Sequence, residues 1–112
     1  MARRSADKIM AAAEYIASQS EAAFQETVVE FAEFNGWYVE HIRDMRGNRP
    51  GTPDLMMWRN ADYVLAELKV GANDLSEDQK LWHAGAAARG VKVYTWRPSD
   101  WPEIEQVLKI PE

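Results

Sequence analysis

Hydrophobic residues recur along the first third of the chain at helical spacing. In residues 7–17 the apolar positions three and four apart are Ile9, Ala13, Ile16 and Ala17. A second stripe consists of Phe24, Val28, Phe31 and Asn35. Because Asn-Gly is a common helix stop, we expect this second helix to end at Asn35-Gly36.

Shorter runs rich in β-forming residues alternate with turn residues in the rest of the chain. They predict strands over residues 37–42, 55–58, 63–70 and 91–96. Helical patterns cover residues 76–89 and residues 100 to about 110, and a Gly/Pro-rich loop covers residues 43–53. The order α-α-β-β-β-α-β-α predicts an α/β fold with a mixed sheet flanked by helices. We expect an N-terminal extension with a short helix over residues 1–17 and a single domain over residues 18–112.

The central hairpin concentrates the candidate chemistry. If residues 59–62 form its loop, Trp58 faces Tyr63, and counting back along both strands places Asp54 opposite Glu67, with Cβ atoms about 4.5–5.5 Å apart. Lys69 projects from the same sheet face as Glu67. Two carboxylates at this spacing suit Mg²⁺, which would relieve their repulsion and acidify a bound water.

A structural alternative to this metal site stays open. The two acids could splay into solvent with Lys69 as their counter-ion, and a slip of one residue in the turn would destroy the pairing.

Composition narrows the classes of site that the chain can hold. Its 112 residues contain no cysteine and two histidines, which excludes disulfides, thiolate zinc sites, a cysteine nucleophile and a multi-histidine metal site. We expect a reducing, cytoplasmic location, since residues 1–112 contain no apolar run of membrane-spanning length and no secretory signal.

The net charge of −5 lowers the expectation of a protein that coats DNA. Its distribution matters more, because residues 19–40 contain five glutamates and no Lys or Arg, whereas residues 41–98 are mildly basic. An enzyme that touches DNA through one face is compatible with this pattern.

The segment Gly51-Thr52-Pro53-Asp54, followed by Glu67-Leu68-Lys69, resembles the PD-(D/E)XK nuclease signature. More narrowly, residues 20–108 resemble the VRR-NUC domain, a virus-type replication-repair nuclease, in its stand-alone phage form. The further matching stretches are Ser20–Gln25, Asn35–Trp37, Leu75–Gln79 and Tyr94–Pro98.

This resemblance implies a restriction-endonuclease-like fold and an endodeoxyribonuclease that depends on Mg²⁺ or Mn²⁺. It implies that Asp54, Glu67 and the carbonyl of Leu68 bind the metal, and that Lys69 orients the attacking water and stabilises the developing charge. It also implies branched or Holliday-junction DNA as substrate, a homodimer, and a bacterial or phage-infected cell, with no membrane and no organic cofactor.

The resemblance adds an acid on the second helix and a glutamine near the site. For the acid, Glu21 lies about 50° from the core direction of the helix and Glu26 lies on the far side, so we favour Glu21. Glu21 could instead form a capping box with Ser18. Gln79 has the same ambiguity, because Ser76 and Gln79 also form a capping box, and both roles are compatible only if the side chain is shared.

The arginines before the hairpin could contact DNA phosphates or could belong to a solvated loop; they are Arg43, Arg46 and Arg49. Among the other residues, we expect His41 to be structural, His83 to lie at a surface or interface, and Arg59 to be solvated. Trp58 and Trp96 should belong to the core. Trp37, Trp82 and Trp101 could be core or part of a patch that a dimer buries.

Two functional alternatives to a nuclease stay open. One is a non-catalytic DNA- or protein-binding module that retains the nuclease fold, and intact Asp54, Glu67 and Lys69 count against it. The other is a structural α/β protein whose acidic hairpin has no chemical role.

Overall fold

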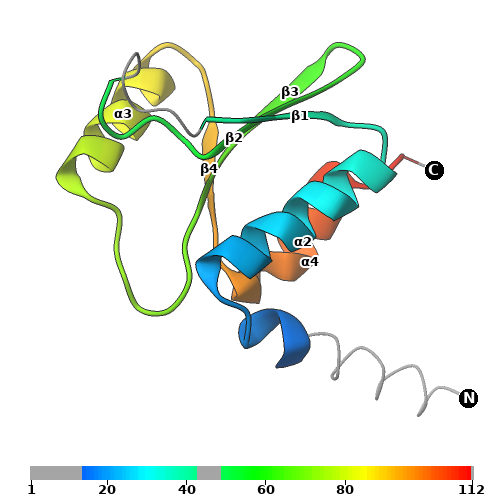
Figure 1. Cartoon of the computed structure of the whole chain (residues 1–112). Coiled ribbons are helices and arrows are strands. Elements are labelled where there is room, and N and C mark those ends of the chain that lie inside the picture. Colours follow the sequence, from blue (N-terminus) through cyan, green and yellow to red (C-terminus); the bar gives the residue numbers. More distant parts are fainter. Residues whose placement is uncertain (1–13, 43–48, 112) are drawn as a thin grey trace, which may run out of the picture.

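The computed structural model describes residues 14–42 and 49–111, in which one four-stranded sheet is flanked by helices (Figure 1). After helical residues 14–17, the elements are α2 (Glu21–Phe34), β1 (Tyr38–His41), β2 (Leu55–Arg59), β3 (Asp62–Leu68), α3 (Glu77–Ala88), β4 (Val93–Trp96), a 3₁₀ turn (Pro98–Asp100) and α4 (Trp101–Leu108). The predicted order and the mixed α/β fold are confirmed.

Helix α2 begins at Glu21, two residues later than a helix with Ser18 as its N-cap would begin. Ser20 is the N-cap, and its side chain accepts a hydrogen bond from the backbone N–H of Ala23 at 3.2 Å. Ser18 donates its hydroxyl to the carbonyl of Tyr15 instead. The capping box between Ser18 and Glu21 was therefore wrong, because Glu21 occupies the first helical position and its side chain is free of a capping role.

The sheet has the order β1-β2-β3-β4, with β1-β2 and β2-β3 antiparallel and β3-β4 parallel. Trp58 pairs with Tyr63 as predicted, but Arg59 and Asp62 also pair, so the loop contains only Asn60 and Ala61. Asn60 has a φ of 56°, in the left-handed region that asparagine tolerates. The tighter loop leaves the register unchanged.

Helices α2 and α4 lie side by side across one face of the sheet (Figure 1). The core lies between them and the sheet, and its fully buried large side chains include Phe24, Leu55, Met57, Trp96 and Ile104. Ile16, from the described end of the predicted N-terminal extension, is also buried in this core.

Arg59 was predicted to be solvated, and this was wrong. Its guanidinium donates to the carbonyls of Asn35, Leu108 and Lys109 at 2.8–3.2 Å and lies 4.4 Å from the ring centroid of Trp37. The last turns of α2 and α4 present carbonyls with no partner inside the helix, and Arg59 satisfies several of them.

The burial of the tryptophans differs from the prediction. Trp96 is fully buried and Trp37 is 5% exposed, whereas Trp58 is 40% exposed and does not belong to the core. Trp58 points to the sheet face opposite α2 and α4, in a row with its strand partners Tyr38 and Tyr63.

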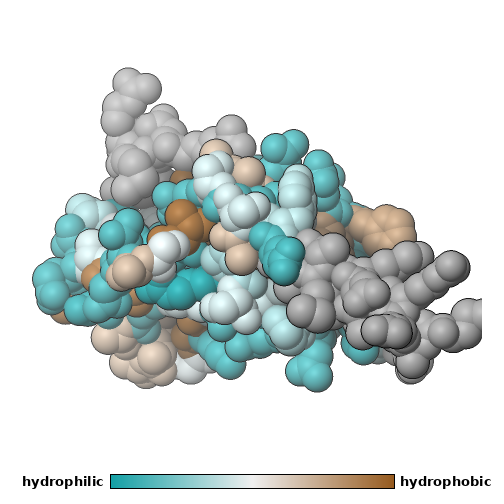
Figure 2. Space-filling model, turned by 90° about the horizontal axis from the view of Figure 1, so that it is seen from below, coloured by the Kyte–Doolittle hydropathy of each residue, from teal (hydrophilic) through white to brown (hydrophobic). Residues whose placement is uncertain are grey.

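The face seen in Figure 2 is mostly hydrophilic, with hydrophobic residues in small separate patches. Among the described residues no helix combines the length and apolar character needed to cross a membrane.

Candidate active site

The acid pair lies at the end of the hairpin opposite its turn. Here the loop before β2 runs beside the end of β3. Leu55 pairs with Ala66, so the next step of the register brings Asp54 opposite Glu67. The backbone N–H of Leu68 donates to Oδ2 of Asp54 at 2.8 Å, which holds this carboxylate against the end of β3. The geometry that the sequence predicts for the pair is therefore present.

Glu67 is enclosed, with only 3% of its surface exposed. Burial and the neighbouring Asp54 carboxylate raise the pKa of Glu67 to about 8, and Lys69 opposes this shift. Oε2 of Glu67 has no hydrogen-bond partner among the described residues. A buried acidic oxygen beside a second carboxylate is costly, and its cost is relieved by a proton or a cation.

Gln79 serves both of the roles that the sequence left open. Its Nε2 donates to Oε1 of Glu67 at 2.8 Å, while its Oε1 accepts from the backbone N–H of Ser76 at 2.8 Å. The Ser76 hydroxyl accepts from the Gln79 backbone N–H at 3.2 Å, which completes the capping box. The same side chain thus caps α3 and fixes one oxygen of Glu67, leaving the other for the site.

Gly51 allows the loop before Asp54 to touch α3, a role that sequence reasoning missed. It has a φ of 88°, and a Cβ there would lie 2.3 Å from the carbonyl oxygen of Asp78 and 2.7 Å from the nitrogen of Gln79. Only glycine fits so close to helix backbone. The Gly-Thr-Pro-Asp motif marks the position, but the contact becomes evident only when α3 is placed.

Lys69 and Glu21 both act on Glu67 electrostatically. Lys69 lowers the pKa of Glu67, and Glu21, at the start of α2, raises it with the smallest effect among the causes. Glu21 is exposed and therefore borders the pair from the solvent side.

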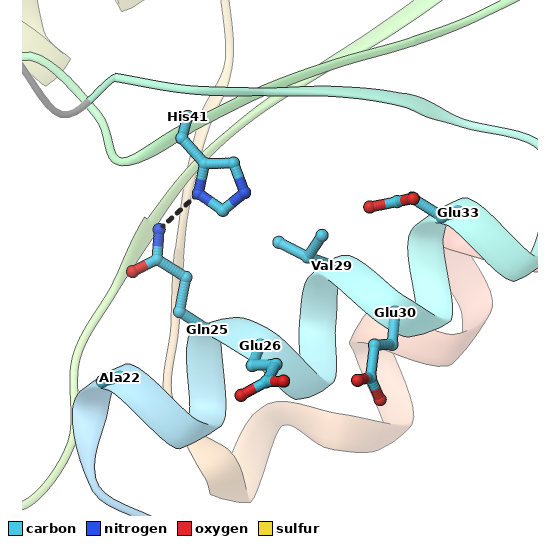
Figure 3. Close-up of a pocket in the computed structure, with 7 residues that line it drawn as sticks. All are labelled: Ala22, Gln25, Glu26, Val29, Glu30, Glu33 and His41. Atoms are coloured by element: carbon cyan, nitrogen blue, oxygen red, sulfur yellow. Dashed lines mark hydrogen bonds between the residues drawn. The ribbon is translucent and has the colours of Figure 1, made fainter.

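Glu26 lies in a different place from the acid pair. It lines a groove of about 610 Å³ between α2 and the end of β1, together with Glu30, Glu33 and His41 (Figure 3). In this groove Gln25 reaches Nδ1 of His41 at 3.2 Å, while the carboxylates of Glu26 and Glu30 point away from the ring. Of the two glutamates, the geometry favours Glu21 as the helix acid near Glu67.

The remaining candidates are dispersed. Arg43 and Arg46 lie outside the described residues, and Arg49 is exposed beside α3. His83 is half-buried on α3, and burial lowers its pKa. It lies one helical turn from Gln79, on the side of α3 that faces the sheet.

Over residues 14–42 and 49–111, no three acidic or histidine side chains converge closely enough to enclose a metal ion by themselves. The site consists of the Asp54–Glu67 pair, with Glu21 farther away. Two carboxylates satisfy the protein share of a Mg²⁺ shell, because Mg²⁺ keeps several waters. The unpartnered Oε2 of Glu67 fits such an ion, so the donor set is compatible with one.

The family model of the VRR-NUC domain matches residues 13–99 of the chain. This range contains the loop at Gly51, the acid pair, Lys69 and Gln79. It begins earlier than the expected residue 20 and ends before α4. None of the curated proteins matches the chain significantly.

Proposed function

Because the chain belongs to the VRR-NUC family of nuclease domains, we propose that it is an endonuclease that hydrolyses DNA phosphodiester bonds with a divalent cation at Asp54 and Glu67. The observation that carries this proposal is the unpartnered, buried Oε2 of Glu67 beside a second carboxylate. A hairpin with a purely structural role would gain nothing from burying this ionisable group beside a second carboxylate.

The two carboxylates, the carbonyl of Leu68 and, from the solvent side, Glu21 would hold Mg²⁺ or Mn²⁺. A cation bound there supplies a Lewis acid for the phosphate and lowers the pKa of a bound water. Gln79 restrains Glu67, and the Leu68 N–H restrains Asp54, so both acids are oriented before a ligand arrives.

Lys69 has the role of positioning the attacking water and stabilising charge on the phosphate oxygens. It follows Glu67 by two residues, so its side chain leaves β3 on the same side. An ammonium near the acid pair would stabilise the negative charge that develops on the phosphate oxygens during the reaction.

We further propose that the substrate is branched or Holliday-junction DNA and that the protein acts as a homodimer. The net charge of −5 suits recognition of a DNA shape better than tight coating of any duplex. Exposed Arg49 would contact phosphates near the site.

Two measurements test the nuclease function. Calorimetric titration with Mn²⁺ should detect binding to the wild type and at least tenfold weaker binding to Asp54→Asn. A cleavage panel of linear, flapped, forked and four-way DNA should give products only with Mg²⁺ or Mn²⁺, fastest on branched DNA.

The matched control for Asp54→Asn is Asp62→Asn, at the other end of the same hairpin, which should bind Mn²⁺ as the wild type does. If neither the wild type nor the control takes up Mn²⁺, the chain is a non-catalytic binding module that retains the fold.

A further inference from the structure

Residues 69–76, which we call the β3–α3 loop, lead from the acid end of β3 to α3 through a wide arc (Figure 1). One end is fixed to the sheet, because the backbone N–H of Lys69 donates to the carbonyl of Trp96 at 3.0 Å. The other end carries Ser76, the N-cap of α3. Between them, residues 71–74 are all exposed, so apolar packing does not determine the course of the loop.

Helix α3, which follows this loop, is also packed loosely. None of its twelve residues is buried. Its first turn nevertheless has to be held closely, because Gln79 donates to Oε1 of Glu67 at 2.8 Å and a hydrogen bond weakens steeply as its geometry departs from the optimum. The backbone of Gly51 lies close against this turn from one side. The β3–α3 loop enters the same turn along the chain, so its course affects where Gln79 lies.

Arg97, the residue after β4, ties the β3–α3 loop to the sheet. Its Nη1 donates to the carbonyl of Gly71 at 3.1 Å, and its Nη2 donates to the carbonyl of Asn73 at 2.6 Å. The backbone N–H of Arg97 donates to the carboxylate of Asp100 at 2.8 Å, so the side chain starts from restrained backbone. A guanidinium is planar and presents its donors as a rigid fork, which allows one side chain to hold two carbonyls in a set relative position.

From these contacts we propose that Arg97 is a positioning residue of the acid pair. Arg97 restrains the β3–α3 loop, and the loop restrains the first turn of α3. Gln79 in that turn then orients Glu67 through the hydrogen bond to Oε1. The effect of Arg97 on cleavage rests on the proposed nuclease function, whereas its effect on Gln79 does not.

Two alternatives to this role are less consistent with the contacts. The ion pair between Lys80 and Asp74 also joins the loop to α3, but both side chains are exposed and 3.5 Å apart, so the pair restrains little. An arginine near the proposed site could instead hold a DNA phosphate. Both Nη atoms of Arg97 already donate to carbonyls of the chain, however, and a phosphate would compete with those carbonyls for the same donors.

Amide hydrogen exchange tests the positioning role without metal or DNA. The backbone N–H of Ser76 donates to Oε1 of Gln79, so its exchange rate reports whether that side chain is held in place. In Arg97→Ala the Ser76 N–H should exchange about tenfold faster, while the amides of α2 stay within about twofold of the wild type. The matched control is Arg89→Ala, whose lost guanidinium donates to the carbonyl of Gly85 in its own helix at 2.9 Å, and it should leave both sets of rates unchanged. An unchanged Ser76 rate in Arg97→Ala would overturn the proposal.

Single-turnover cleavage of branched DNA in Mg²⁺ tests the consequence for the acid pair. Arg97→Ala should lower the maximal rate by about tenfold and leave the half-saturating protein concentration within about twofold, since a misplaced Glu67 affects the chemical step and not DNA binding. Arg97→Lys retains a cation but loses the fork, so its maximal rate should lie between those of Arg97→Ala and the wild type. Weaker DNA binding with an unchanged maximal rate would assign Arg97 to the DNA and overturn the proposal.

A double-mutant cycle separates an effect through Gln79 from a general loss of stability. If Arg97 acts through Gln79, adding Arg97→Ala to Gln79→Ala should lower the maximal rate by less than about twofold further, because the side chain that Arg97 positions is already gone. A second loss of about tenfold would contradict the proposal. A wild type that cleaves no DNA would contradict the nuclease function, and the exchange rates would still decide the positioning role.

Discussion

The two ends of the β2–β3 hairpin differ in the side chains that they bury on one and the same sheet face. At the loop end, the aromatic residues Trp58 and Tyr63 are 40% and 49% exposed. At the other end, Glu67 is 3% exposed and has Asp54 beside it. One hairpin thus leaves apolar rings partly in water and buries an ionisable carboxyl group, the reverse of the arrangement that stability alone favours.

This reversal indicates what each end does. The loop end is held by the other face, where Arg59 joins the ends of α2 and α4. The acid end is held by Gln79 and by the Leu68 N–H, contacts that orient charge without removing its cost. Violations of the burial pattern concentrate at functional sites, and here the violation marks the acid end.

The largest effect expected at the acid end is on catalysis. Lys69→Ala should lower the rate of cleavage of branched DNA by about 10²–10³-fold, because a preorganised positive charge near the phosphate is lost. The measurement is single-turnover cleavage in Mg²⁺. Lys80→Ala is the control. Lys80 pairs with the exposed Asp74 and Glu77, each at 3.5 Å, and its replacement should keep the rate within about twofold. Equal loss in both variants would contradict the role of Lys69.

At the loop end, a large effect on stability is expected from Arg59. Arg59→Ala should lower the free energy of unfolding by about 2–4 kcal/mol, because several helix-end carbonyls lose a charged donor and Trp37 loses its stacked guanidinium. Urea unfolding followed by far-UV circular dichroism measures it. Arg97→Ala removes two hydrogen bonds to the carbonyls of Gly71 and Asn73 in an exposed loop and should cost less than about 1 kcal/mol. Similar losses for both would show that Arg59 does not join the helices.

Replacing the buried acid, in contrast, should raise the free energy of unfolding. In EDTA at pH 8, Glu67→Gln should raise the free energy of unfolding by roughly 1–3 kcal/mol, because the amide can donate to Asp54 and still accept from Gln79. The pKa of Glu67 is about 8 in the folded chain against 4.5 ordinarily, so its stabilising contribution is full below pH 4.5 and is lost as the pH rises through 8.

The gap between Glu67→Gln and the wild type should therefore narrow between pH 8 and pH 5. Mg²⁺ at pH 8 should stabilise the wild type and not the variant. A variant less stable than the wild type at pH 8 in EDTA would mean that Glu67 already has a satisfying partner.

The fold and the acid pair could be predicted because they depend on local patterns. Helical and strand periodicities set the element order, and the number of residues between Asp54 and Glu67 sets their register once a hairpin is assumed. The error in the loop, two residues instead of four, did no harm because both loops are centred on the same point of the chain.

The errors arose where a residue's role depends on elements distant in sequence. Arg59 contacts Asn35 and Leu108, so its position in a hairpin turn made it look solvated. Trp58 was assigned to the core from its strand position, but the half of the sheet face beneath it carries no helix. The shared role of Gln79 and the contact of Gly51 with α3 likewise required the crossover helix to be placed.

The smallest effect is expected from the exposed ring at the loop end. Trp58→Ser should change the free energy of unfolding by less than about 1 kcal/mol, since the ring is partly in water and loses mainly its contact with Tyr38, whose ring centroid is 6.1 Å away. Met57→Ala, one residue earlier and fully buried, should cost about 2–5 kcal/mol. Thermal unfolding of both variants against the wild type measures the difference. If Trp58→Ser cost as much as Met57→Ala, the loop end would depend on its aromatic row after all, and the contrast between the two ends of the hairpin would no longer separate stability from function.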